Sequence, residues 1–211
     1  MATYTEDWCS SNIPIWTGLL GKYKDKPDIR FLEIGSYQGR SVIWMLENIL
    51  THETSRAHCI DTFQGSDEHT DAQKKNIFEI FTANTEPFKE KVSVHVGKSF
   101  DILKKMPDDE LFDIIYIDGD HKAQSVLQDA VLAWPLLKTD GILIFDDYGS
   151  GPMHHYERLE DYPRLAINGF CNSQGDELQV LHRGYQLVVQ KVDRMDVIWR
   201  RYYTRPNPCL P

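Results

Sequence analysis

Acidic residues follow two apolar segments of this sequence, at the positions where strands would end. Asp118-Gly119-Asp120-His121 comes after the apolar run at residues 111–117, and Asp146-Asp147 comes after residues 141–145. If these segments are nearby parallel strands, three or four carboxylates converge on one edge of a sheet. Carboxylates that close raise one another's pKa, and a hard divalent cation such as Mg²⁺, Ca²⁺ or Mn²⁺ relieves their repulsion. We therefore expect a cation site at this edge.

A second candidate site is the stretch Glu33-x-Gly35-x-x-x-Gly39, which follows another apolar run. A glycine-rich turn after a buried strand lets the backbone approach a ligand closely. Glu33 would repel a pyrophosphate and would suit a positively charged ligand group, such as an amino-acid ammonium. The spacing also departs from the dinucleotide fingerprint G-x-G-x-x-G.

Two further strand ends carry candidate ligand contacts. Asp61 follows residues 57–60 at about the spacing at which a carboxylate meets ribose hydroxyls, and its alternative role is to cap a turn. Gly97-Lys98-Ser99 resembles the end of a phosphate-binding P-loop, but Val92 stands where that motif requires a glycine. Ser99 could equally cap the helix that follows it.

These residues need a scaffold, and the apolar patterns predict one. Strands are expected at residues 30–34, 57–60, 92–96, 111–117 and 141–145, and helices at 13–20, 40–50, 69–84, 99–106 and 122–134. Such alternation predicts a doubly wound, mostly parallel α/β sheet, whose carboxyl edge would collect Glu33, Asp61, Asp118 and Asp146. We expect one domain over residues 1–193 and a C-terminal tail over 194–211.

The pattern changes after Tyr148. Gly149 to Pro152 breaks the alternation, and a helix interrupted near Pro163 is expected within residues 156–170. Residues 178–181 and 185–191 read as two strands joined at Arg183-Gly184. We expect this antiparallel pair to close the sheet.

The stretch from Glu33 to Gly39 resembles motif I of the class I S-adenosylmethionine (SAM)-dependent methyltransferases. The resemblance implies a Rossmann-like, seven-stranded sheet with an antiparallel C-terminal strand. It also implies that SAM is bound near the first four strand ends, by Glu33, Gly35, Ser36, Gly39, Ser41, Asp61, Thr62, Phe63, Gly97, Ser99 and Asp118.

The acidic clusters, with Leu136 to Gly141 between them, look like those of the metal-dependent small-molecule O-methyltransferases. The most similar group contains antibiotic-sugar O-methyltransferases and cephalosporin hydroxylase-like proteins. The resemblance implies Mg²⁺ on Asp118, Asp146 and Asp147, with Asp120 as general base. His121, which directly follows Asp120, is a second candidate base. The acceptor would be a hydroxylated small molecule such as a sugar, a glycoside or a catechol.

Other interpretations stay open. Asp120 could cap the helix that begins near Lys122, His121 could be a helix-terminus histidine, and Asp147 could be a turn residue. The enzyme could also transfer the methyl group without a metal, using Asp120 or His121 as base. A third possibility is a SAM-fold protein that binds partners and performs no chemistry.

The composition of the chain limits the kinds of molecule that it is expected to bind. A net charge of −9 over 211 residues disfavours sequence-independent binding to nucleic acid, and no apolar run is long enough to span a membrane. Asp146-Asp147-Tyr148-Gly149 lacks the Asn/Asp-Pro-Pro-aromatic pattern of nucleic-acid amino methyltransferases. No signal peptide is evident and the cysteines form no C-x-x-C motif, so we expect a cytoplasmic protein.

Two aromatic segments complete the predictions. A substrate lid could include His154, His155, Tyr156 and Tyr162. In the tail, Trp199, Tyr202 and Tyr203 could be buried in a homodimer, whereas the arginines at 194, 200, 201 and 205 are expected to form only a solvated surface.

Overall fold

The computed structural model describes residues 2–66, 69–107, 109, 111–150 and 162–195. The predicted lid residues 154–156 and the aromatic tail residues 199, 202 and 203 lie outside these ranges. Within the described part of the chain, every helix is too short or too polar to traverse a lipid bilayer.

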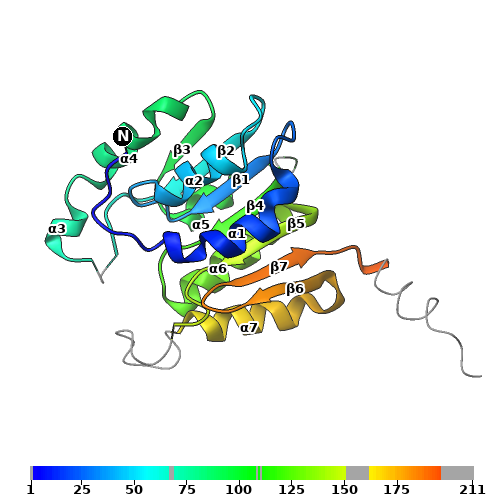
Figure 1. Ribbon diagram of the computed structural model, residues 1–211. Helices are drawn as coiled ribbons and strands as arrows, with labels where there is room; N and C mark the ends of the chain where they lie inside the picture. Colours follow the sequence, from blue (N-terminus) through cyan, green and yellow to red (C-terminus); the bar gives the residue numbers. More distant parts are fainter. Residues whose placement is uncertain (1, 67–68, 108, 110, 151–161, 196–211) are drawn as a thin grey trace, which may run out of the picture.

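A seven-stranded sheet forms the centre of the molecule (Figure 1). Its strands, in the spatial order β3-β2-β1-β4-β5-β7-β6, are β3 (Val92–Val96), β2 (Arg56–Asp61), β1 (Arg30–Ile34), β4 (Phe112–Ile117), β5 (Leu137–Phe145), β7 (Leu187–Lys191) and β6 (Leu178–Arg183). The first five in space are parallel, whereas β7 runs antiparallel to both of its neighbours. The chain reverses direction along the sheet between β3 and β4, so a crevice is expected beyond the carboxyl ends of β1 and β4.

Helices cover both faces of the sheet (Figure 1). The bounds are α1 (Ile13–Leu20), α2 (Arg40–Asn48), α3 (Asp71–Lys74), α4 (Ile77–Thr85), α5 (Ser99–Leu103), α6 (Ala123–Ala133) and α7 (Pro163–Gln174). Apolar residues of α1, α2 and α4 share one core with the sheet, and those of α5, α6 and α7 share the core on the other face. Strands buried on both faces explain why the sequence shows continuous apolar runs.

The structure confirms the predicted sheet, including the antiparallel closure. Two local expectations were wrong. The helix predicted over 69–84 is broken into α3 and α4, because Asn76 takes a left-handed conformation with φ of 58° between them. Ser99 is the first residue of α5 and not its cap, since Lys98 occupies the cap position without a side-chain hydrogen bond.

Candidate active site

A cavity of about 1010 Å³ lies at the carboxyl ends of the central parallel strands. Most of the residues predicted from the sequence line it, namely Gly35, Ser36, Ser41, Asp61, Thr62, Gly97, Ser99, Asp118, Asp120, His121, Asp146 and Asp147. Three predicted cofactor contacts, Glu33, Gly39 and Phe63, are not among the lining residues. The volume suits a small-molecule cofactor together with part of a second ligand.

The turn after β1 requires glycine at Gly35. Its φ is +87°, and a Cβ atom there would lie 1.9 Å from the backbone oxygen of Asp118. The main chains of β1 and β4 therefore come into close contact, supported by the bond from Asp118 N to Ile34 O (2.8 Å). Gly39 has φ of +83° and precedes α2, where it packs against Phe81 and away from the cavity.

Glu33 lies beneath this turn. Its side chain has no exposed surface, and its Oε1 accepts a hydrogen bond from the Ser41 hydroxyl at 2.5 Å. Burial raises the pKa of Glu33 to about 7. The carboxyl group thus positions Ser41, which does line the cavity, and cannot itself meet a ligand directly.

Asp61 holds the turn in place. Its Oδ2 accepts hydrogen bonds from the backbone N–H groups of Ser36 and Tyr37, both at 2.7 Å, and its Oδ1 accepts one from Phe63 N at 2.6 Å. A carboxylate has about four lone-pair positions, so one remains for a ligand hydroxyl. Asp61 therefore caps the turn, which is one of the two roles that the sequence left open, and keeps one lone-pair position for the other.

The aromatic ring of Phe63 turns into the protein. It packs between Phe78 and Phe81, with ring centroids 4.8 and 5.0 Å away, and φ of 54° at Phe63 directs it there. The neighbouring Thr62 lines the cavity in its place.

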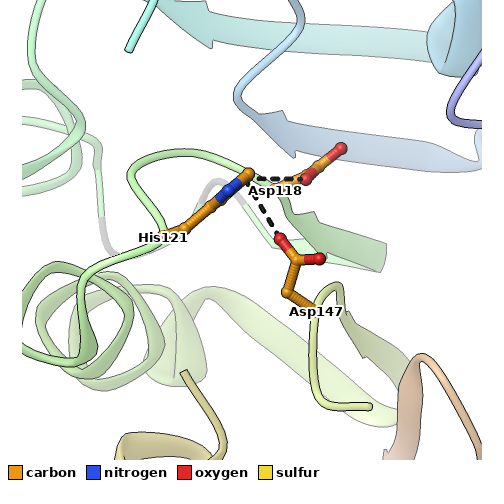
Figure 2. Close-up of side chains that lie close together, drawn as sticks. All are labelled: Asp118, His121 and Asp147. Carbon is orange, nitrogen blue, oxygen red and sulfur yellow. Dashed lines mark ion pairs between the residues drawn. The ribbon is translucent and has the colours of Figure 1, made fainter. Parts of the chain in front are cut away.

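Asp118, His121 and Asp147 gather at the ends of β4 and β5 (Figure 2). His121 Nε2 lies 3.2 Å from Asp147 Oδ2 and 3.6 Å from Asp118 Oδ1. One ligand atom from each residue lies within 4.8 Å of the others, a spacing at which all three could hold one metal ion. His121, which the sequence offered as a base, is therefore also a candidate metal ligand.

Asp146 points toward a different partner. Its Oδ2 lies 2.5 Å from the Tyr116 hydroxyl oxygen and Asp118 Oδ2 lies 2.9 Å from it, so the single hydrogen of this hydroxyl serves one carboxylate at a time. Burial, followed by the charges of Asp118 and Asp147, raises the pKa of Asp146 well above its usual range. Asp146 thus borders the acidic group without belonging to the three residues that could share an ion.

Asp120 is exposed at the rim of the cavity. Its Oδ2 accepts the Ser125 hydroxyl at 2.7 Å, and its Oδ1 is 3.4 Å from Lys122 N. These bonds to the start of α6 are those of a capping residue, although the side chain still faces the cavity.

Several residues at the site carried no signal in the sequence. Tyr116 and Tyr185 bind the acidic group through their hydroxyls, and Tyr185 donates to Asp147 Oδ1. Tyr116 sits inside an apolar strand, and Tyr185 in a hairpin, so both read as packing residues. The N-terminal residues Asp7 and Trp8 also line the cavity, and no motif surrounds them.

The donor set fits both implied ligands. Asp118 and Asp147 supply carboxylate oxygens, which suit Mg²⁺ or Mn²⁺, and His121 supplies an imidazole nitrogen, which suits a transition metal such as Zn²⁺ or Fe²⁺. Burial raises the pKa of Asp118, an effect that a cation would oppose. For SAM, Asp61 and Ser41 would supply polar contacts along the cavity wall.

Comparison with known proteins identifies the family. A family model described as a methyltransferase domain matches residues 32–148, more than half of the chain. A curated relative, the uncharacterised protein R132 of Acanthamoeba polyphaga mimivirus, is 29% identical over 125 residues. That alignment covers 59% of this chain and 53% of the relative, so the chain spans about half the length of the curated relative it matches.

Solved structures share the fold. An O-methyltransferase from Bacillus cereus in complex with SAH is 18% identical, with a TM-score of 0.63 over 89% of this chain and 84% of that one. TomG of Streptomyces achromogenes, an O-methyltransferase of tomaymycin synthesis in complex with SAM, is 17% identical, with a TM-score of 0.57 over 78% and 73%. CalS11, a TDP-rhamnose 3'-O-methyltransferase of calicheamicin biosynthesis, is 14% identical, with a TM-score of 0.59 over 87% and 80%.

These similarities agree with three features of the structure: the glycine turn after β1, the order of the strands and the cavity at their carboxyl ends. The chain therefore belongs to the family of methyltransferase domains and has the fold of the class I SAM-dependent methyltransferases.

Proposed function

We propose that this protein transfers a methyl group from SAM to a hydroxyl group of a small molecule, with a divalent cation such as Mg²⁺ at the acidic group. The observation that carries the proposal is one cavity bounded by the glycine turn after β1 and by Asp118, His121 and Asp147. The first part has the chemistry of a cofactor site, and the second can hold a cation.

The cation would rest on Asp118 and Asp147, with His121 or Asp146 as a further ligand. When bound, it supplies Lewis acidity, which lowers the pKa of a nearby hydroxyl group. Tyr116 and Tyr185 orient the carboxylates through their hydroxyls, as outer partners of metal ligands commonly do.

SAM supplies an electrophilic methyl group on its sulfonium. Asp61 would accept a ribose hydroxyl, and Ser41 is held at the cavity wall by Glu33. The Gly97 and Ser99 loop lies farther along the same wall, beyond Asp61, where the adenine end would reach. Most of the rate enhancement then comes from holding the two reactants in line.

A base must take the hydroxyl proton. Asp120 could receive it at a lone pair that Ser125 and Lys122 leave free, since Asp120 lines the cavity. His121 is the other candidate, and Asp147 Oδ2, 3.2 Å from its Nε2, would stabilise the resulting imidazolium.

The acceptor class rests on the relatives. CalS11 acts on TDP-rhamnose, and TomG is involved in tomaymycin synthesis, so hydroxylated natural products are the first candidates here. The net charge of −9 favours a small acceptor over a nucleic acid.

One observation favours a metal-independent variant of the same reaction. His121 already lies between two carboxylates, an arrangement that would keep its imidazole oriented as a base without a cation. Dependence on a divalent ion separates the two candidates.

The test measures SAH release from SAM over a panel of sugars, glycosides and catechols, with Mg²⁺ or with excess EDTA. We expect turnover that EDTA abolishes and Mg²⁺ restores. Asp147→Asn should lower kcat at least about 100-fold, because the cation would lose one of its charged carboxylate ligands. Asn tolerates the positive φ of 54° at this position, so the backbone stays intact.

Asp113→Asn is the matched control. Asp113 lies on the same strand as Tyr116, at the opposite end of the sheet, where it pairs with Lys138 at 2.8 Å. It should keep wild-type turnover. Full activity in EDTA would reject the metal and leave the His121 or Asp120 mechanism, whereas no turnover on any acceptor class would count against methyl transfer to small molecules.

A further inference from the structure

The edge strand β3 has one neighbour in the sheet, β2, and nothing in the described ranges pairs with its outer side (Figure 1). Two hydrogen bonds fix the direction of its backbone groups: Ala57 N donates to Lys91 O (2.8 Å), and Gly97 N donates to Asp61 O (2.9 Å). Because successive residues of a strand direct their N–H and C=O groups to opposite sides, the odd-numbered residues of β3 face β2. The groups that point outward belong to the three valines of the strand, Val92, Val94 and Val96.

In the described part of the chain, this edge lacks the features that usually protect an open strand. Such features are charged side chains, proline, a bulge or a covering segment. The five residues of β3 include no acidic residue, no lysine or arginine and no proline, and the pairing with β2 has no register shift. Lys91, just before the strand, is turned back and donates its Nζ to the backbone oxygens of Leu50 and His52. The edge is therefore free to pair with another strand.

The opposite edge of the sheet, formed by β6, differs in this respect. Its pairing with β7 is interrupted between Val180 and His182, and the strand ends in the charged residue Arg183. On β3, by contrast, the ladder is regular while Val94 is 40% exposed and Val96 is 60% exposed. Exposed apolar side chains on a regular, unprotected edge indicate a strand partner.

The sequence of β3 complements itself. It alternates valine with a polar residue symmetrically about Val94. If a second copy pairs antiparallel with Val94 opposite Val94, then Val92 lies opposite Val96 and Ser93 lies opposite His95. Only this register lets all three outward-facing valines of each copy exchange hydrogen bonds, and it also packs valine against valine on one face of the sheet.

The charges that flank the strand match the same register. Glu90 lies four residues before Val94 and Lys98 lies four residues after it. Both are exposed, and neither has an ion-pair partner among the described residues. Antiparallel pairing about Val94 places Glu90 of each copy opposite Lys98 of the other, and opposite charges across two strands stabilise their pairing. Registers centred on Ser93 or His95 lose this match.

We propose that β3 is a dimer interface, at which the β3 strands of two copies of this chain pair antiparallel about Val94 and join their sheets into one. The partner is a second copy because both the valines and the flanking charges are self-complementary. A two-fold contact of this kind closes the open edge of both copies. The pairing does not depend on the proposed methyl transfer, although Lys98 lines the cavity and the partner subunit's Glu90 would therefore lie near its rim.

Analytical ultracentrifugation of the full chain over a range of protein concentrations tests the interface. The wild type should pass from monomer to dimer as the concentration rises, since a contact this short is expected to be reversible. Val94→Pro should weaken the dimer about 100-fold or more, because it removes the central outward N–H group and blocks the approach of the partner backbone. The bonds to β2 stay, because proline is tolerated where the N–H faces solvent, and far-UV circular dichroism checks that the variant is folded.

Two charge variants test the register. Lys98→Glu places two glutamates opposite one another at each end of the interface, and Glu90→Lys places two lysines there, so each variant alone should weaken the dimer about tenfold. An equimolar mixture of the two should recover the wild-type affinity, because only the mixed dimer has opposite charges at both ends. Lys89→Glu is the matched control: Lys89 pairs with Glu86 of its own chain at 2.9 Å, so this change should alter the dimer affinity less than about twofold.

A wild-type protein that stays monomeric at every concentration would overturn the proposal. A dimer that Val94→Pro leaves intact would also overturn it, because such a dimer must use another surface. The same holds if the mixture of the two charge variants dimerises no better than either variant alone.

Discussion

At the scale of single residues, Tyr116 contributes one hydroxyl to two aspartates. Its OH group lies 2.9 Å from Asp118 Oδ2 and 2.5 Å from Asp146 Oδ2, although it has only one hydrogen to donate. Burial raises the pKa of Tyr116 well above its usual range, so the phenol stays protonated and remains a donor. The sequence predicts only a packing role for Tyr116 within its strand, but its hydroxyl orients the carboxylates of both Asp118 and Asp146.

Glu33 gives a pH-dependent prediction at the same scale. Folding raises its pKa from 4.5 to about 7, so between these values the folded chain binds a proton that the unfolded chain has released. Stability from this group therefore falls as the pH rises through that window. Glu33→Gln keeps an acceptor for Ser41 and removes the charge.

Urea denaturation checks this prediction. The stability of Glu33→Gln relative to wild type should increase between pH 5 and pH 8 by about 2–3 kcal/mol, from the shift between the two pKa values. Glu53→Gln, at an exposed turn, should show no such change. A relative stability that is flat across this range would mean that Glu33 is not destabilised by burial.

The sequence predicts the acidic residues of the site better than their partners. Asp118, Asp146 and Asp147 could be found because each follows an apolar run, which fixes its place at a strand end. Tyr185 and Asp7 reach the cavity from a hairpin and from the N-terminal segment, and no local pattern specifies such long-range contacts. His121 was predicted because it directly follows the acidic residues Asp118 and Asp120 in the sequence. Its position beside both Asp118 and Asp147 depends on the fold and could not be predicted.

At the scale of elements, strand positions were predictable and helix interruptions were not. Buried parallel strands must be apolar on both faces, which makes them visible as runs. The break between α3 and α4 depends on one residue, Asn76, whose left-handed conformation has no strong sequence signature. The expected apolar face still formed, since Ile77 and Phe81 are both buried.

The turn after β1 carries the prediction at this scale. Gly35→Ala would place a Cβ atom 1.9 Å from a backbone oxygen at a φ of +87°, and neither strand can move without disrupting the sheet. We expect a loss of more than about 3 kcal/mol in the free energy of unfolding, measured by urea denaturation.

Gly18→Ala supplies the comparison. Gly18 lies within α1 and an added Cβ would meet nothing within 4 Å. That change should be neutral or stabilising by up to about 1 kcal/mol, as for other glycines in helices. Similar stabilities for the two variants would show that the turn can relax, contrary to its tight contact with Asp118.

At the scale of the whole molecule, a line of hydrogen bonds joins distant parts of the chain. Trp16 Nε1, on α1, donates to Gln186 Oε1 at 2.7 Å, and Gln186 Nε2 lies 3.5 Å from the Tyr116 hydroxyl. Trp16 and Gln186 have no exposed surface. The first helix and the last hairpin are thereby connected to the Tyr116 hydroxyl, which contacts the acidic group.

A double-mutant cycle tests this connection. Trp16→Phe and Gln186→Met should each cost about 1–3 kcal/mol of stability, because each leaves a buried polar partner unsatisfied. The double variant should cost clearly less than the sum, with a coupling of about 1 kcal/mol or more. Strictly additive costs would show that the bond contributes nothing to stability.

The position of β7 has a consequence for how the protein is made. Because β7 lies between β5 and β6, β6 is synthesised before β7 but has no neighbour in the sheet until β7 has inserted. Tyr185 and Gln186 arrive immediately before it and contact the acidic group and α1. A nascent chain that has reached only β6 therefore exposes the open edge of β5, and the site lacks its contact with Tyr185 until β7 has paired.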